Sequence, residues 1–194
     1  MKKIHAVSLV LVASTLIALN SCWIPENFKV NVTVNKDGGY TFIYDGTLMY
    51  APTVAVANKG ELTQEDTAAG EKELREESGI KNIKYLGKGR YKIYAEKSVT
   101  PGYDYDFMDI FSINSHQDGT IEITVAKLDD TTRNQLKSID TKISGNLTVS
   151  LKKGVKVIRH NAQYKPMFGL FGSYKWESAS FNDAPLIVVQ PAFN

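Results

Sequence analysis

Residues 28–44 read FKVNVTVNKDGGYTFIY, and their pattern indicates the kind of sheet that the chain forms. Apolar and polar side chains alternate over residues 28–34, which is the period-2 pattern of a strand with one buried face. Residues 35–39 contain Asp and Gly, which tolerate the positive φ of a tight turn. A second alternating run follows through Tyr40, Phe42 and Tyr44, and the strand that it predicts extends past Asp45-Gly46 to Tyr50. The stretch therefore predicts an antiparallel hairpin that opens a β-rich domain.

Further strands and two helices follow this hairpin. Residues 52–78 break the alternation and are rich in Ala, Glu and Lys, with Thr63 suited to cap a helix start and Ser78-Gly79 to end it. A second, shorter helix is expected over residues 130–138. Alternation predicts further strands over residues 83–85, 90–95, 103–114, 120–126, 145–151, 155–158, 174–177 and 186–189. We predict an α+β domain with one large, curved, mainly antiparallel sheet and two inserted helices.

Residues 1–21 have the layout of a secretory signal. Two lysines open it, and the apolar run that follows is too short for a membrane span of about 20 residues. Leu19-Asn20-Ser21-Cys22 resembles the bacterial lipobox, in which the cysteine is lipidated, although Asn20 departs from the usual small residue. Cys22 is the only cysteine, so it has no disulfide partner in the chain. We predict an exported lipoprotein anchored through Cys22 to the cell membrane or the outer membrane, the alternatives being an ordinary cleaved signal or an uncleaved anchor.

The sequence after the lipobox predicts a short tether, residues 22–27, and a single domain, residues 28–194. The tether contains no Ser- or Gly-rich linker, and at about 3.3–3.6 Å per residue it reaches at most about 20 Å. We therefore expect the domain to stay close to the bilayer, with Trp23 at the level of the lipid head groups.

Charge and composition exclude several classes of function. Two of the 23 lysines and arginines lie in the signal, so the mature chain has 21 basic and 21 acidic residues. A neutral, exported domain has no electrostatic basis for general nucleic-acid binding. His116 and His160 are not spaced as metal ligands, and no nucleophile motif or phosphate-binding loop is present. We therefore expect neither an enzyme nor a protein that carries a metal or a cofactor.

Two features remain as candidate contacts for a ligand. Lys88, Arg90 and Lys92 would project from one face of a strand, with Tyr91 turned inward, and such cations gain about 1 kcal/mol each at an anionic leaflet. The other feature is the apolar segment 166–172, which contains Phe168, Leu170 and Phe171. An ordinary solvated face would explain the cations, and a flap tucked over the core would explain the apolar segment, as an alternative to an exposed patch that meets lipid.

The order of these signals, and the closing stretches GNLTV (145–149), VKVIRHNA (155–162) and Lys175-Trp176-Glu177, resemble the mycobacterial LppM lipoprotein family. The resemblance implies an exported α+β domain of an envelope lipoprotein that binds phosphatidylinositol-type glycolipids. Members often carry a C-terminal transmembrane helix, whereas residues 186–194 are too short for one and contain Pro191. The family has no catalytic motif to transfer to this chain.

Two hypotheses of function follow. The first is a non-enzymatic, membrane-anchored lipoprotein that binds a lipid or glycolipid. Its apolar contacts would be Tyr91, Phe168, Leu170, Phe171 and Trp176, and Lys88, Arg90 and Lys92 would meet an anionic head group. The second is a protein-interaction subunit of an envelope assembly or secretion complex, which lends a strand edge to an envelope partner.

Overall fold

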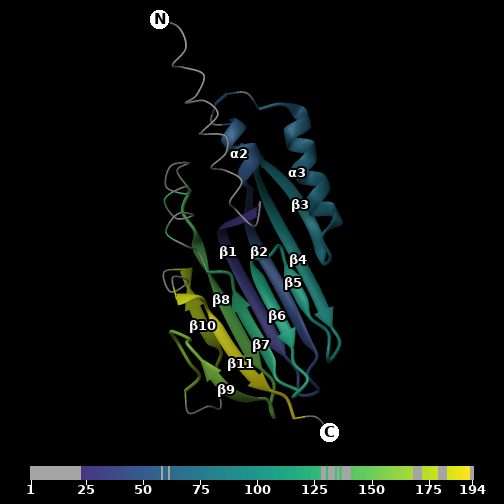
Figure 1. Ribbon diagram of the computed structural model, residues 1–194, viewed down its shortest axis with the longest axis vertical. Coiled ribbons are helices and arrows are strands. Elements are labelled where there is room, and N and C mark those ends of the chain that lie inside the picture. The colour runs from purple at the N-terminus through teal and green to yellow at the C-terminus, as the bar shows by residue number, and fades with distance from the viewer. Residues whose placement is uncertain are drawn as a thin grey trace, which may run out of the picture.

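The protein folds into two β-sheets with helices at one end, as the computed structural model shows (Figure 1). The structure describes residues 23–57, 59–60, 62–127, 130, 134, 136, 141–167, 172–178 and 183–192. Strands dominate, and two helices, α2 and α3, lie between the second and third strands. The α+β prediction agrees with this content. The single large sheet is wrong, because the strands divide between two sheets.

The first sheet has six strands in the order β10-β8-β1-β2-β4-β3. Their bounds are β1 (Trp23–Val34), β2 (Tyr40–Tyr50), β3 (Ile80–Gly87), β4 (Arg90–Val99), β8 (Ser144–Leu151) and β10 (Tyr174–Glu177). The predicted hairpin β1–β2 is confirmed, with Val34 opposite Tyr40. β8 pairs in parallel with β1 from Asn27 to Val34, so the sheet is mixed. The alternating pattern of β8 predicts a strand but does not specify the direction of its neighbour.

The second sheet has five strands in the order β5-β6-β7-β11-β9. Their bounds are β5 (Tyr105–Phe107), β6 (Phe111–Ser115), β7 (Ile121–Val125), β9 (Lys156–His160) and β11 (Leu186–Gln190). Residues 103–114, predicted as one strand, form two, because Met108 and Asp109 adopt φ angles of 59° and 55° and turn the chain. The turn at residues 152–154 leads from the first sheet to the second.

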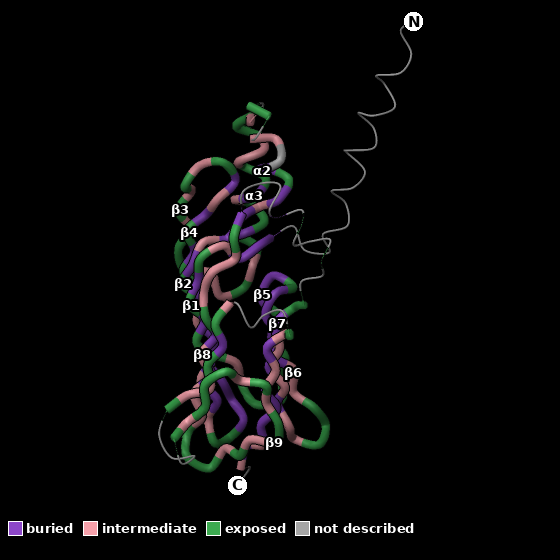
Figure 2. The backbone as a smooth tube through the Cα atoms, turned by 90° about the vertical axis from the view of Figure 1, so that its left-hand side faces the viewer, coloured by how far each residue is buried: buried purple, intermediate pink, exposed green. Residues whose placement is uncertain are grey.

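The core lies between the two sheets, which Figure 2 shows edge-on with buried residues toward the middle. Every second residue of β2 from Tyr40 to Leu48 is buried, as the alternation predicts. Aromatic rings join the layers: the centroid of Phe42 lies 5.2 Å from that of Phe107, and the centroid of Phe28 lies 5.7 Å from that of Phe111. Such contacts fill the space between the sheets with side chains.

The helices lie at the end of the molecule where β1 begins (Figure 1). α2 (Ala51–Ala57) continues from β2, and α3 (Gln64–Glu76) follows. The predicted helix start is confirmed, because the Thr63 side chain accepts a hydrogen bond from the Asp66 N–H and the Asp66 carboxylate accepts one from the Thr63 N–H. Leu74 of α3 is buried in the main core, so the helix covers part of the first sheet. The helix predicted at residues 130–138 lies largely outside the described residues.

No helix within the described part of the chain is long and apolar enough to cross a membrane.

Candidate functional site

The start of β1 differs from the predicted tether. Residues 23–27 belong to β1, and Trp23 is only 4% exposed. Its ring centroid lies 4.7 Å from that of Tyr50 and 5.6 Å from that of Tyr91, and its Nε1–H donates to Glu73 Oε1 at 2.7 Å. Trp23 therefore packs against the sheet and contacts α3 and is not placed for head-group contact. Residue 22, the predicted lipidation site, lies outside the described residues.

A bulge explains why the sequence pattern missed this part of β1. The register of β1 against β2 shifts between Pro25 and Asn27, so the alternation seen from Phe28 onward is interrupted there. Beyond the bulge, Trp23 pairs with Tyr50 and Ile24 pairs with Met49. The large apolar surface of Trp23 and Ile24 is buried by this pairing, which is the physical reason that the strand extends to residue 23.

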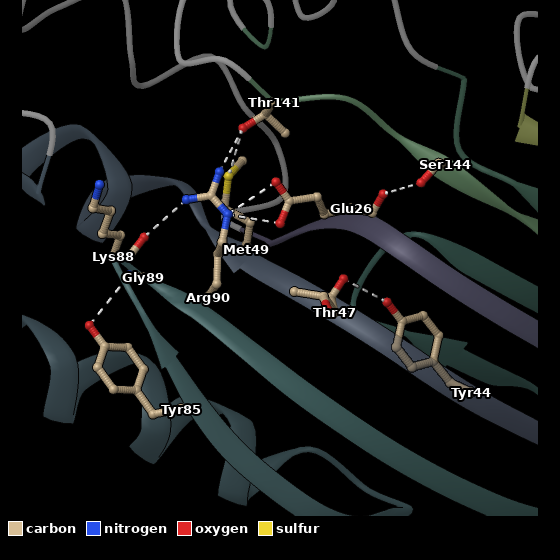
Figure 3. Close-up of polar contacts among 10 residues, drawn as sticks. All are labelled: Glu26, Tyr44, Thr47, Met49, Tyr85, Lys88, Gly89, Arg90, Thr141 and Ser144. Atoms are coloured by element: carbon tan, nitrogen blue, oxygen red, sulfur yellow. Dashed lines mark hydrogen bonds and ion pairs between the residues drawn. The ribbon is translucent and has the colours of Figure 1, made fainter.

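The three predicted cations do not form one open face, and two of them, Lys88 and Arg90, are drawn in Figure 3. Lys88 is exposed in the turn between β3 and β4, with a φ of 50° between two glycines that also have positive φ. Arg90 is half-buried at the start of β4 and makes an ion pair with Glu26 of β1. Lys92 is exposed but pairs with Asp45 of β2. Of the three, only Lys88 forms no ion pair within the described part of the chain.

Arg90 joins three segments that are distant in sequence. Its Nε–H donates to both carboxylate oxygens of Glu26, at 3.0 and 2.8 Å, and Nη2 donates to the Thr141 hydroxyl at 3.3 Å. Thr141 is buried and lies just before β8. Because the Arg90 and Glu26 side chains are each only about a fifth exposed, 23% and 21%, the pair is partly shielded from water. This arrangement makes Arg90 a structural clamp at the helix-bearing end.

Truncation of Glu26 to Ala is expected to lower the free energy of unfolding by about 1–3 kcal/mol. This lies between the ~1 kcal/mol or less of an exposed pair and the ~3–5 kcal/mol of breaking a fully buried one. Urea denaturation monitored by tryptophan fluorescence measures the change. The control is Lys72→Ala, which breaks an exposed pair with Glu76 and should change the free energy of unfolding by less than about 1 kcal/mol. Equal effects of the two variants would contradict the clamp.

The predicted aromatic contacts are core residues. Tyr91 is fully buried, and its hydroxyl donates to the carbonyl of Thr67 in α3 at 2.8 Å. Burial raises the pKa of Tyr91 to about 12, so the hydroxyl stays protonated and remains a donor. Trp176 is also buried, and its Nε1–H donates to the side-chain oxygen of Asn161 at 2.9 Å. Neither ring is available to a ligand in this structure.

The apolar segment 166–172 is described only in part. Phe168, Leu170 and Phe171 lie outside the described residues, so their predicted role is neither supported nor contradicted. Met167, which precedes them, is 73% exposed.

A small hollow lies where several turns meet. Gly38, Gly102 and Gly119 line it together with Ser115 and His116. Its volume is about 70 Å³, far below the roughly 300–1,000 Å³ of small-molecule pockets. The Ser115 hydroxyl donates to the carbonyl of Tyr103 and is already engaged. The hollow has no room for an acyl chain, and the described residues include no group of His, Cys, Asp and Glu side chains placed to hold a metal ion.

The open edges of the two sheets are surfaces that the sequence pattern alone does not reveal. β3 and β9 are edge strands, each paired on one side only among the described strands. Leu86 of β3 and Ile158 of β9 are exposed by 51% and 59%. Edge strands carry unpaired backbone donors and acceptors, which can pair with an added strand. The alternation predicts that these strands exist, but their edge positions depend on the order of the sheets.

Comparisons with known proteins add little. No family model and no curated protein matches the sequence. Among solved structures, the chain is similar to the folded domain of the Mycobacterium tuberculosis LppM protein, determined by NMR, over 89% of this chain and 92% of that one. The two are 10% identical and the TM-score is 0.39. A likeness of this level does not establish function.

Proposed function

We propose that the protein is a non-enzymatic bacterial envelope lipoprotein, held to the cell membrane or the outer membrane by lipid on Cys22, whose domain acts as a protein-interaction module. The observation that carries the proposal is the start of β1 at Trp23, the residue after the lipobox cysteine. Trp23 is buried, and consecutive Cα atoms are only 3.80 Å apart. An acyl chain on Cys22 would therefore be attached directly next to the folded sheet, with no flexible tether between them.

This attachment determines which part of the domain lies near the bilayer. The turn between β3 and β4 lies at the same end as Trp23, because Trp23 pairs with Tyr50 and the neighbouring Met49 pairs with Arg90. The opposite end, where Val34 pairs with Leu151, points away from the anchor. With a lipid on Cys22, the end of the domain that contains Trp23 would lie near the membrane. The opposite end and the sheet edges would then be accessible to protein partners.

Three observations favour interaction through the surface over a bound lipid. Aromatic and aliphatic side chains pack together between the sheets, and Tyr91 and Trp176 are part of that core. Two of the three predicted cations are engaged with carboxylates. By contrast, β3 and β9 present open edges with exposed Leu86 and Ile158. Strand addition at such an edge is a known mode of peptide recognition.

Binding of a lipid or glycolipid is the second candidate. Lys88 favours it, because this exposed cation lies in a turn at the anchored end and would gain about 1 kcal/mol near anionic head groups. Lipid extraction and mass spectrometry of the purified mature protein test this candidate. Co-purification of a defined lipid would support it. Absence of lipid, together with no retention of an unlipidated variant on anionic liposomes, would remove it.

The anchor itself is tested by Cys22→Ser. The variant is expected to move from the membrane fraction to the soluble fraction, because it lacks the thiol that accepts the lipid, and intact mass analysis should show no acyl chains. Ser21→Ala is the matched control, since it keeps a small residue beside the cysteine and should leave the protein in the membrane fraction. If the Cys22→Ser protein stays with the membrane, or if native Cys22 carries no lipid, the proposal fails.

A further inference from the structure

Charge is distributed unevenly along this chain. Residues 141–176 contain seven lysines and arginines and no acidic residue, whereas residues 61–77 contain seven acidic residues. The basic stretch includes β8, β9 and part of β10. The predicted mature chain, with 21 basic and 21 acidic residues, therefore has a basic region with its own electrostatic preference for partners.

Three of these seven basic residues lie at the turn that leads into β9 and at the start of that strand. Lys152 and Lys153 occupy this turn, which is held by hydrogen bonds from the Lys152 N–H to the carbonyl of Val34, at 2.9 Å, and from the Val155 N–H to the carbonyl of Lys152, at 3.1 Å. Lys156 follows at the start of β9. The three lysines are exposed, and none forms an ion pair with a described residue. We call Lys152, Lys153, Lys156 and Ile158 the β9 edge cluster.

β9 combines these cations with an open backbone edge and an apolar side chain. It pairs with β11, and no described strand pairs with its other side. The pairing of β9 with β11 shifts register between Val188 and Val189 of β11, which interrupts the alternation of buried and exposed side chains in β9. Ile158 is 59% exposed, whereas Val157 packs against the core. Arg159, the next residue, is engaged with Glu122 at 3.1 Å. The cluster thus offers hydrogen-bonding groups, one apolar contact and three unpaired cations.

The bilayer that holds Cys22 does not explain the cluster. Lys152 follows the end of β8 that pairs with Val34, and β1 has 12 residues between the anchored end and Val34. At about 3.3 Å per residue, the lysines lie about 36 Å from the start of β1 along the strand. This distance is several times the Debye length of about 8 Å at physiological ionic strength. An electrostatic role at that membrane would require the domain to lie flat.

We infer that the β9 edge cluster binds an extended acidic segment of a partner protein, which adds to β9 as a further strand. Backbone hydrogen bonds along β9 would supply the pairing, and opposite charges across neighbouring strands would select acidic residues next to the lysines. An apolar residue of the segment would cover Ile158. This inference rests on the proposed function, because it specifies the chemistry of the protein partner that the anchored domain would bind.

The test uses the mature chain, residues 22–194 with Cys22→Ser, and a fluorescent ten-residue peptide in which Val and Glu alternate. Fluorescence anisotropy should show binding of this peptide, and no binding of a peptide in which Lys replaces Glu. Changing Lys152, Lys153 and Lys156 together to Glu should weaken binding at least tenfold. The matched control changes three exposed lysines of the first sheet, Lys29, Lys81 and Lys84, to Glu, and should bind as the parent does.

Several outcomes would overturn the inference. One is the absence of peptide binding by a folded parent protein. If the triple Lys→Glu variant of the β9 edge cluster then aggregated, the lysines would serve to prevent edge-to-edge pairing of β9 between molecules. Others are an equal loss of binding in both triple variants, and equal competition by polyphosphate, since the cluster would then recognise charge and not a strand. Binding of the parent to phosphatidylglycerol vesicles, with loss in the β9 variant, would assign the cluster to lipid. None of these results affects the Cys22 experiment, so the two proposals fail separately.

Discussion

Replacement of Trp23 by Ala is expected to lower the free energy of unfolding by about 3–5 kcal/mol, the range for deleting a large aromatic side chain from a core. Trp23 is buried against Tyr50 and Tyr91, and its indole N–H donates to Glu73 of α3. The substitution would leave a cavity between the sheet and the helix and remove that hydrogen bond. Urea denaturation of the mature chain with Cys22→Ser measures the effect.

The control for this experiment is Trp23→Phe. It keeps a ring against Tyr50 and loses the donor to Glu73, so the expected loss is smaller, about 1–2 kcal/mol. The comparison separates packing from the hydrogen bond. If Trp23→Ala unfolds with the parent's midpoint and slope, residue 23 belongs to a tether and the rigid attachment of the domain is wrong.

Gly46→Ala is expected to cost about 3 kcal/mol or more, at the upper end of overpacking effects. Gly46 faces Phe28 across the β1–β2 ladder, and a Cβ there would lie 2.5 Å from the Cβ of Phe28 and 2.7 Å from the carbonyl oxygen of Asn27. Gly145 faces Phe28 from the other side, in β8, where a Cβ would lie 2.5 Å from the Phe28 carbonyl oxygen. Backbone atoms of β1 lie next to both glycines, so β1 has little freedom to move aside for a Cβ at either position.

Thermal unfolding followed by circular dichroism tests this prediction, with Gly60→Ala as the control. Gly60 has a φ of 75° but open space around its Cα, so Ala there carries only the cost of a left-handed backbone, about 1–2 kcal/mol. Gly46→Ala should lower the melting temperature clearly more than Gly60→Ala does. Equal shifts would mean that Phe28 moves aside and that the close approach is not needed.

Local patterns predicted most of the elements. Apolar and polar residues alternate over residues 28–34 and 40–48 because one face of each strand is buried, and that face is buried in the structure. Thr63 caps α3 as its residue type suggests, because the cap depends only on residues within one helical turn. Such features are determined by neighbours in the sequence, so the sequence is sufficient to predict them.

The errors come from contacts between distant residues. Whether strands form one sheet or two depends on how β8 returns beside β1, and this parallel pairing leaves no local signal. The predicted cationic face is wrong for the same reason. Arg90 forms an ion pair with Glu26, which is 64 residues away in the sequence. Met108 adopts a left-handed φ that its residue type rarely adopts, and Asp109, which tolerates such a φ, has no Gly beside it, so the sequence does not predict the turn between β5 and β6.

The candidate site was predictable only in part. The sequence located cations near residue 90 and an apolar residue at 176, but the structure places Tyr91 and Trp176 in the core. Lys156 falls within the predicted strand 155–158, and Lys152 and Lys153 lie between the predicted strands 145–151 and 155–158. Their proposed role in binding a partner depends on the position of β9 at the edge of its sheet. Edge positions follow from the packing of the whole chain, which no short pattern encodes.

The position of β1 also determines how the domain would respond to mechanical load. β1 begins beside the predicted anchor and is hydrogen-bonded to β2 on one side and to β8 on the other. If a partner held the far end while the membrane pulled on Cys22, the force would run along β1, across the perpendicular hydrogen bonds of the β1–β2 ladder and the slanted hydrogen bonds of the β1–β8 ladder. These bonds would be sheared together and not broken one at a time, so the strand nearest the lipid is the one best placed to resist tension.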